Sequence, residues 1–141
     1  MKSLFALLIT LTAILFNTGC GSSKKASSNP QSKLTGTWEL SFITGPRITF
    51  EGLYPNKKPQ LTFTGNGNVT GNTSCNAWGA AVVISNNEMK FSQGFSTKMF
   101  CEGAGEPTFL QMIDKVTNYS IENNTLLLKG GELVLMKFNK K

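Results

Sequence analysis

Apolar and polar residues alternate through most of the chain after residue 34, which predicts β-strands. Leu61 and Phe63 are separated by a threonine, and the Gly-Asn-Gly-Asn run after them favours a hairpin turn of type I′, because asparagine and glycine tolerate positive φ angles. The predicted strands cover residues 38–42, 61–64, 69–71, 78–84, 89–91, 119–121, 126–128 and 133–138. We therefore expect a mainly β fold, a small antiparallel barrel or meander.

A single segment has helical spacing instead. Its apolar residues stand at positions 109, 112, 113 and 116, and Pro107 occupies a place that the first turn of a helix tolerates. The pattern predicts one short α-helix over about residues 107–116. Since an isolated helix of that length is unstable in water, we expect its apolar stripe to pack on the sheet as a lid.

The first 20 residues have the pattern of a targeting segment. Lys2 precedes an apolar run from Leu4 to Phe16, which is too short to span a bilayer but typical of a signal-peptide core. Gly19-Cys20 resembles the end of a bacterial lipoprotein signal, in which the cysteine is lipidated and becomes the mature N-terminus; an ordinary secretory signal is the alternative. This predicts a signal peptide over residues 1–19 and an anchor at Cys20.

The residues that follow suit an anchored protein. Residues 20–33 are rich in serine and lysine and indicate a flexible tether, which leaves residues 34–139 as one β domain. The expected location is the bacterial cell envelope. Gly21 lacks the Asp that resembles an inner-membrane retention signal, which favours the outer membrane.

Charge and composition exclude several functions. The 14 Lys and Arg outnumber the 8 Asp and Glu, but residues 34–139 hold eight of each, so the surplus lies outside the domain. A neutral domain offers no surface for nucleic acid. The chain has no histidine, which removes Ser-His-Asp catalysis and His-ligated metal, and its acidic residues are scattered. We expect no enzyme, no cofactor and no metal.

The cysteine count points to a disulfide. If Cys20 carries lipid, Cys75 and Cys101 remain as a pair in an oxidising compartment. Two free thiols are the main alternative, and a catalytic or metal role is a weaker one. If the pair forms, Cys75-Asn76 meets Ser96-Thr97-Lys98. A Ser-Lys nucleophile would need a buried lysine, so we favour turn capping by Asn76 and Thr97.

Five strings taken in order resemble the META domain of HslJ-like lipoproteins. They are Gly36-Thr37-Trp38-Glu39-Leu40, Pro59-Gln60-Leu61-Thr62-Phe63, Gly71-Asn72-Thr73-Ser74-Cys75-Asn76, Ser96-Thr97-Lys98-Met99-Phe100-Cys101, and Glu106 with Phe109-Leu110. The resemblance implies a small lipocalin-like barrel with one helix, tethered in the envelope and linked to heat shock, antibiotic tolerance or secretion, with no enzyme mechanism and no agreed ligand.

The opening Gly36-Thr37-Trp38 also resembles that of true lipocalins. In that family an arginine from the last strand packs on the tryptophan, and Lys137 is the nearest substitute here.

These patterns favour a non-enzymatic, membrane-anchored envelope protein that acts through contacts with another envelope protein. The loop of residues 50–59 supplies Leu53 and Tyr54 as candidate binding residues, and Trp78 is a third. The same loop could instead pack Leu53 and Tyr54 underneath it. A small-molecule carrier with a ligand in the barrel is the alternative function. We expect a monomer.

Overall fold

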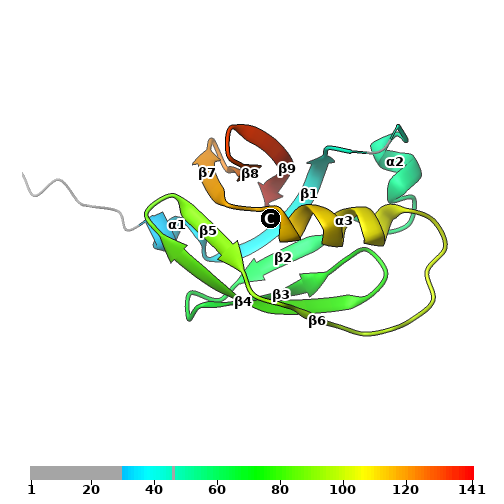
Figure 1. Ribbon diagram of the computed structural model, residues 1–141, viewed down its shortest axis with the longest axis horizontal. Helices are drawn as coiled ribbons and strands as arrows, with labels where there is room; N and C mark the ends of the chain where they lie inside the picture. The colour runs from blue at the N-terminus through cyan, green and yellow to red at the C-terminus, as the bar shows by residue number, and fades with distance from the viewer. Residues whose placement is uncertain (1–29, 46) are drawn as a thin grey trace, which may run out of the picture.

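The computed structural model describes residues 30–45 and 47–141 (Figure 1). The predicted signal peptide, Cys20 and most of the predicted tether lie outside these residues. The helices are α1 (Pro30–Leu34), α2 (Phe50–Leu53) and α3 (Gly105–Asp114). The strands are β1 (Gly36–Ile43), β2 (Gln60–Phe63), β3 (Asn68–Asn72), β4 (Ala77–Ser85), β5 (Glu88–Phe91), β6 (Phe95–Ser96), β7 (Asn118–Glu122), β8 (Thr125–Gly130) and β9 (Leu133–Lys140).

The strands form a closed antiparallel barrel, which confirms the predicted fold class. Pairing runs in the order β1, β2, β3, β4, β5, β7, β8 and β9, and β9 returns to β1. The short β6 continues the edge of β4 that β5 leaves uncovered. The weakest seam joins β5 to β7. One residue pair, Glu88 with Asn118, aligns there, and backbone bonds from Met89 N to Thr117 O (3.0 Å) and from Tyr119 N to Asn87 O (2.8 Å) complete it.

Alternate strand residues fill the barrel because side chains on a strand point to opposite faces. Trp38, Leu61, Leu126 and Phe138 are each 0% exposed. Helix α3 lies where a helix was predicted and buries Phe109 completely, with its ring edge-on to that of a β4 tryptophan. The expected lid is therefore part of the core.

The domain begins before the predicted residue 34, with helix α1. Residues 30–33, predicted as the end of the tether, form a helix that ends at the buried Leu34. Trp38 Nε1 donates to the Leu34 carbonyl at 2.7 Å, and Lys140 Nζ donates to the carbonyls of Lys33 (3.0 Å) and Thr35 (2.8 Å). These bonds satisfy carbonyls that the end of a helix leaves without partners.

The lysine on the barrel tryptophan is not the predicted one. Lys140 Nζ lies 4.8 Å from the centre of the Trp38 ring, whereas Lys137 lies over Phe42. The prediction of Lys137 was wrong because the β1–β9 pairing places Trp38 opposite Lys140, whereas Lys137 stands opposite Phe42.

The β7–β8 and β2–β3 turns differ in their backbone angles. Both Asn123 and Asn124 have positive φ angles, as a type I′ turn requires, whereas in the predicted Asn66-Gly67 turn only the glycine does. Among the described helices, none has the length and apolar character needed to cross a bilayer.

Candidate functional site

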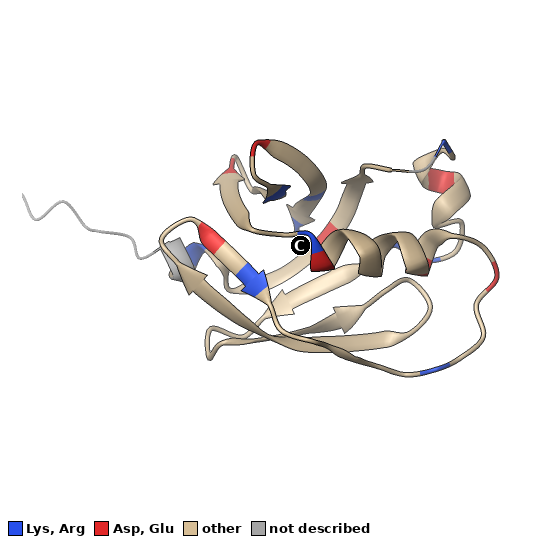
Figure 2. Cartoon of the chain, viewed as in Figure 1, with Lys and Arg blue, Asp and Glu red and all other residues tan. Residues whose placement is uncertain are grey.

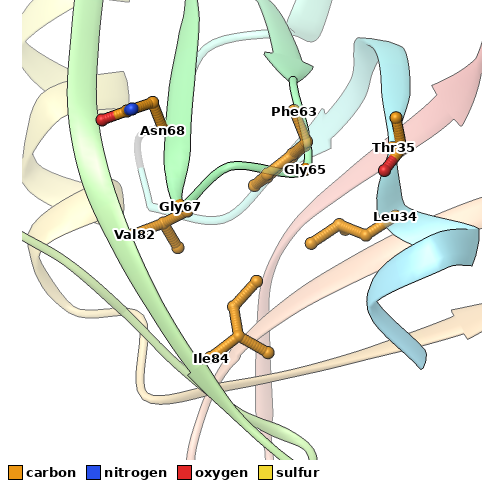
Figure 3. Close-up of a pocket in the computed structure, with 8 residues that line it drawn as sticks. All are labelled: Leu34, Thr35, Phe63, Gly65, Gly67, Asn68, Val82 and Ile84. Atoms are coloured by element: carbon orange, nitrogen blue, oxygen red, sulfur yellow. The ribbon is translucent and has the colours of Figure 1, made fainter. Parts of the chain in front are cut away.

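A cluster of buried side chains occupies the described part of the barrel interior. Figure 3 shows a cavity near α1, where Leu34, Phe63, Val82 and Ile84 approach one another. Its volume is about 10 Å³, which is room for at most one water molecule. This part of the described interior does not accommodate a small-molecule ligand.

The three predicted binding residues are buried. Leu53, Tyr54 and Trp78 are 8%, 3% and 4% exposed. Tyr54 donates its hydroxyl proton to the Gly105 carbonyl at 3.0 Å, and burial raises its pKa. Trp78 points into the barrel and packs edge-on to Phe91 and Phe109. The prediction that these side chains form a binding surface is therefore wrong, and the alternative, a loop packed over Leu53 and Tyr54, describes the structure.

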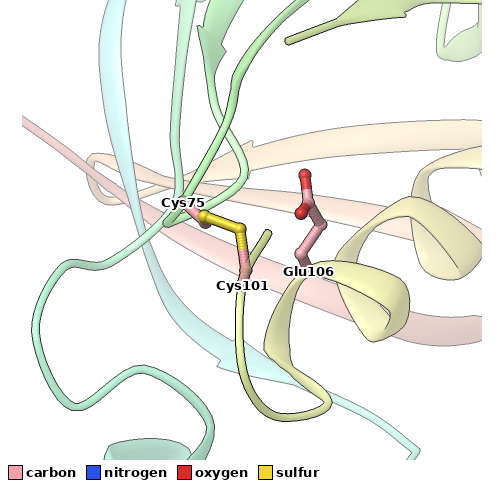
Figure 4. Close-up of side chains that lie close together, drawn as sticks. All are labelled: Cys75, Cys101 and Glu106. Atoms are coloured by element: carbon pink, nitrogen blue, oxygen red, sulfur yellow. A yellow bond between two sulfur atoms is a disulfide. The ribbon is translucent and has the colours of Figure 1, made fainter. Parts of the chain in front are cut away.

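The second predicted constellation does come together. Cys75, in the turn between β3 and β4, forms a disulfide with Cys101, just before α3; their Cα atoms are 6.2 Å apart. Figure 4 shows the disulfide beside Glu106, which projects from the first turn of α3. The bond ties a hairpin turn to the segment that enters the helix.

Asn76 holds the backbone next to that disulfide. Its side chain is buried and its Oδ1 accepts from Thr97 Oγ1 at 2.7 Å and from Met99 N at 2.9 Å. Its Nδ2 donates to Glu106 Oε2 at 2.8 Å and to the Met99 carbonyl at 3.2 Å. Both backbone groups of Met99 are thus bound by one amide, so Asn76 caps this segment as predicted.

The network continues into α3 through Thr73. This fully buried side chain donates to Glu106 Oε1 at 2.6 Å and accepts from Asn76 N at 3.1 Å. Each Glu106 oxygen therefore has a donor from the β3–β4 turn. Because the buried members satisfy one another, the network fixes the relative position of the turn, the helix and the loop.

The same atoms do not form a metal centre while the disulfide is intact. The sulfurs of Cys75 and Cys101 and a Glu106 oxygen lie within 4.8 Å of one another. Metals bind cysteine as the thiolate, and both sulfurs are spent in the S–S bond. A Ser-Lys nucleophile is also not formed, since Lys98 is exposed and the Ser96 hydroxyl donates to the Thr97 carbonyl at 3.0 Å.

The loop that this network holds carries two exposed apolar side chains, which the sequence analysis did not predict as a binding surface. Met99 and Phe100 are 59% and 89% exposed. We call residues 97–101 the clamped loop, because Asn76 binds its backbone and the disulfide fixes its end. The available signal was Met99-Phe100 directly before a cysteine, in a segment that lacks strand alternation.

The charged residues are dispersed. In the view of Figure 2, Lys and Arg stand on several separate elements and acidic residues lie among them. The described chain includes an ion pair at 3.0 Å between Lys141 and Glu39, which holds the pKa of the Glu39 carboxyl below its usual value.

Comparison with known proteins identifies a family and a fold. The family model described as META domain matches residues 32–141. No curated protein matches the chain. An NMR structure of a protein from Burkholderia xenovorans is similar, with a TM-score of 0.59 and 16% identity over 79% of this chain and 86% of that one. A crystal structure of a DUF4847 family protein from Bacteroides vulgatus has a TM-score of 0.56 and 15% identity over 77% and 95% of the two chains. At these identities the likeness shows the fold alone.

Proposed function

The chain belongs to the META domain family, and from that premise we propose that it is a non-enzymatic, lipid-anchored envelope protein that binds a protein partner through the clamped loop. The observation that carries the proposal is the exposure of Met99 and Phe100 on a backbone held by Asn76 and the disulfide. Large apolar side chains on a rigid support are the typical anchors of protein interfaces.

The rigidity of the loop supports binding as much as its apolar character. A flexible loop loses conformational entropy when a partner fixes it, and that loss weakens the complex. Here the network of Thr73, Asn76 and Glu106 has fixed the loop before binding. Methionine adapts to irregular surfaces, so Met99 suits the edge of a contact centred on Phe100.

The anchor decides where the partner would be. Lipidation at Cys20 would hold the domain on a tether at a membrane surface, with the outer membrane favoured. The partner would then be another envelope protein, and the stress-related role implied by the family would be exercised through it. The neutral domain favours no nucleic acid partner. The carrier alternative has less support, because the cavity near α1 holds at most one water.

The proposal is tested by photocrosslinking in the bacterial envelope. A photoreactive amino acid replaces Phe100 in the full chain, and a matched control replaces Leu133, which is 60% exposed on β9. We expect a discrete adduct with one envelope protein from position 100 and none from position 133. Replacing both Cys75 and Cys101 by alanine should reduce that adduct several-fold, because the loop loses its fixed end.

Two results would overturn the proposal. Equal adduct patterns from positions 100 and 133 would mean that the clamped loop has no specific partner. For the anchor, the variant Cys20→Ser should lose both labelling by palmitate and sedimentation with membranes; if it keeps both, lipidation at Cys20 is wrong.

A further inference from the structure

A groove lies on the outer wall of the barrel, on different residues from the clamped loop. Its volume is about 410 Å³, and it runs between the β2–β3 turn and the segment that joins β5 to β6. Asn66, Asn68, Thr70 and Gln93 supply its polar lining, and Phe95 forms one side. Because Val69 is buried, its neighbours Asn68 and Thr70 point outwards, towards the groove.

Phe95 is an exposed aromatic ring with a fixed position. It is 70% exposed, yet it lies against β4 at Gly79, its partner in the β4–β6 pairing. A Cβ atom at Gly79 would stand 2.6 Å from Cζ of the Phe95 ring, so a glycine there is what lets the ring rest on the strand. The Cζ–Cε1 edge of the ring lies against Gly79, and the rest of the exposed side chain is available to a ligand.

The polar groups beside the ring are available as well. Thr70 and Gln93 are both exposed, so the Thr70 hydroxyl and the Gln93 side-chain amide can reach a ligand in the groove. The Asn66 Oδ1 accepts from Asn68 N at 3.2 Å, which fixes the rim of the turn. A hydroxyl and an amide together offer both donors and acceptors.

The row of hydroxyls continues past the groove along the sheet. Strand pairing aligns Phe95 with Gly79, Gly79 with Thr70, Thr70 with Thr62, and Thr62 with Thr37. The hydroxyls of Thr62 and Thr37 are 2.9 Å apart. Neighbouring strands lie about 4.8 Å apart, so this row leads an extended ligand across several strands.

The lining restricts the class of ligand. Its nine residues include no Lys, Arg, Asp or Glu, which disfavours a phosphate or a metal cation. Its polar rim disfavours a lipid chain. By contrast, a larger depression of about 620 Å³ near the β5–β7 seam is lined by Glu88, Lys90 and Asp114 and lacks an aromatic ring. An uncharged ligand with many hydroxyls and one apolar face fits the groove at Phe95.

We infer that this groove binds an uncharged saccharide chain. The apolar face of one sugar ring lies on Phe95, as aromatic side chains combine a large apolar area with a defined orientation. The sugar hydroxyls bond Thr70 and Gln93, directly or through water. The next sugar units of the saccharide follow the row of threonine hydroxyls towards Thr62. The inference does not depend on the proposed protein partner, because it uses neither Met99 nor Phe100.

The test is an NMR titration of the mature full chain with neutral tetrasaccharides of glucose and of N-acetylglucosamine at millimolar concentration. We expect saturable shifts at Thr70, Gln93 and Phe95. The variant Phe95→Ala should weaken binding at least tenfold. Since Thr70→Val keeps the shape of the side chain and removes the hydroxyl, it should weaken binding several-fold in a chain that folds normally.

Two control variants separate this groove from other surfaces. Phe100→Ala, in the clamped loop, and Val83→Ala, on the other half of β4, should bind each saccharide as the unaltered chain does. The inference is overturned if neither tetrasaccharide gives saturable shifts, if the shifts centre on Phe100, or if Phe95→Ala and Thr70→Val bind normally. Loss of photocrosslinking at position 100 together with normal saccharide binding would overturn the proposed function alone.

Discussion

Two loops of the molecule differ in where their apolar side chains lie: one loop buries them and the other exposes them. In the loop between β1 and β2, Leu53 and Tyr54 turn inwards, and the Tyr54 hydroxyl bonds the first residue of α3. In the clamped loop, Met99 and Phe100 turn outwards. Both segments carry apolar residues in a short stretch, so composition alone does not distinguish them.

The difference lies in what anchors each loop. The first is anchored by its side chains, so those side chains are buried. The second is anchored by its backbone: Asn76 binds the N–H and the carbonyl of Met99, and the disulfide fixes Cys101. A backbone whose polar groups are satisfied needs no buried side chain to hold it. In this molecule the exposed apolar pair lies on the loop whose backbone is held by a distant side chain and by a disulfide.

The largest effect on this difference between the two loops should come from replacing Asn76 by alanine. We expect Asn76→Ala to lower the free energy of unfolding by about 3 kcal/mol, because it leaves Glu106, Thr97 and the Met99 amide without their partner in a partly buried site. Urea denaturation measures the loss. Hydrogen exchange at the Met99 amide should also accelerate, since its acceptor is gone.

The control for this change is Asn139→Ala, at an exposed position on β9. It should alter stability by less than about 0.5 kcal/mol. If the two alanine variants are equally stable, the network around Asn76 does not anchor the loop.

Much of the fold could be predicted because its signals are local. Alternation located the eight strands of the barrel, and the spacing of Phe109, Met112 and Ile113 located α3. Elements without such signals were missed. The two-residue β6 has too few residues to alternate, and α2 has a single turn. Helix α1 is stabilised by hydrogen bonds from Trp38 on β1 and Lys140 on β9, which no pattern within its own residues shows.

The candidate site likewise combines features that the sequence predicted with features that it did not. The cysteine count pointed to Cys75 and Cys101, which lie at disulfide distance, and Asn76 was expected to cap a turn. Its bond to Glu106 was not foreseen, because 30 residues separate the two and no spacing rule connects them. Burial of Leu53 and Tyr54 depends on where α3 lies, which the residues of their own loop do not determine. Contacts between distant segments are the part that a pattern along the chain omits.

A smaller effect should distinguish the two buried tyrosines. Tyr54→Phe removes the bond to the Gly105 carbonyl and should cost about 1 kcal/mol of unfolding free energy. Tyr119→Phe is the matched control. In the described chain its buried hydroxyl has no hydrogen-bond partner, so its removal should be neutral or stabilising. Urea denaturation of both variants makes the comparison. A larger loss at Tyr119 than at Tyr54 would mean that the hydroxyl of Tyr54 does not anchor the first loop.

The smallest predicted loss of stability concerns Glu39, which contacts Gln60 where the first loop ends. Glu39 pairs with Lys141 at 3.0 Å and accepts from Gln60 Nε2 at 2.7 Å; Lys141 first, and then Gln60, holds the pKa of its carboxyl below the ordinary value of 4.5. A carboxyl whose pKa is lowered by folding stabilises the protein above its ordinary pKa, and the contribution is lost as the pH falls through the folded value. Since the pair is partly exposed, Glu39→Gln should cost about 0.5 kcal/mol at neutral pH and nothing once both states are protonated.

The matched variant for this pair is Lys141→Gln, measured by urea denaturation at neutral and acidic pH. Because both substitutions remove the same ion pair, the double variant should be hardly less stable than either single one. Additive losses, or a loss from Glu39→Gln that persists in acid, would show that the carboxylate does not act through Lys141. The carboxylate would then act through Gln60, where the first loop ends, and a polar contact would have to be added to the buried side chains that hold that loop.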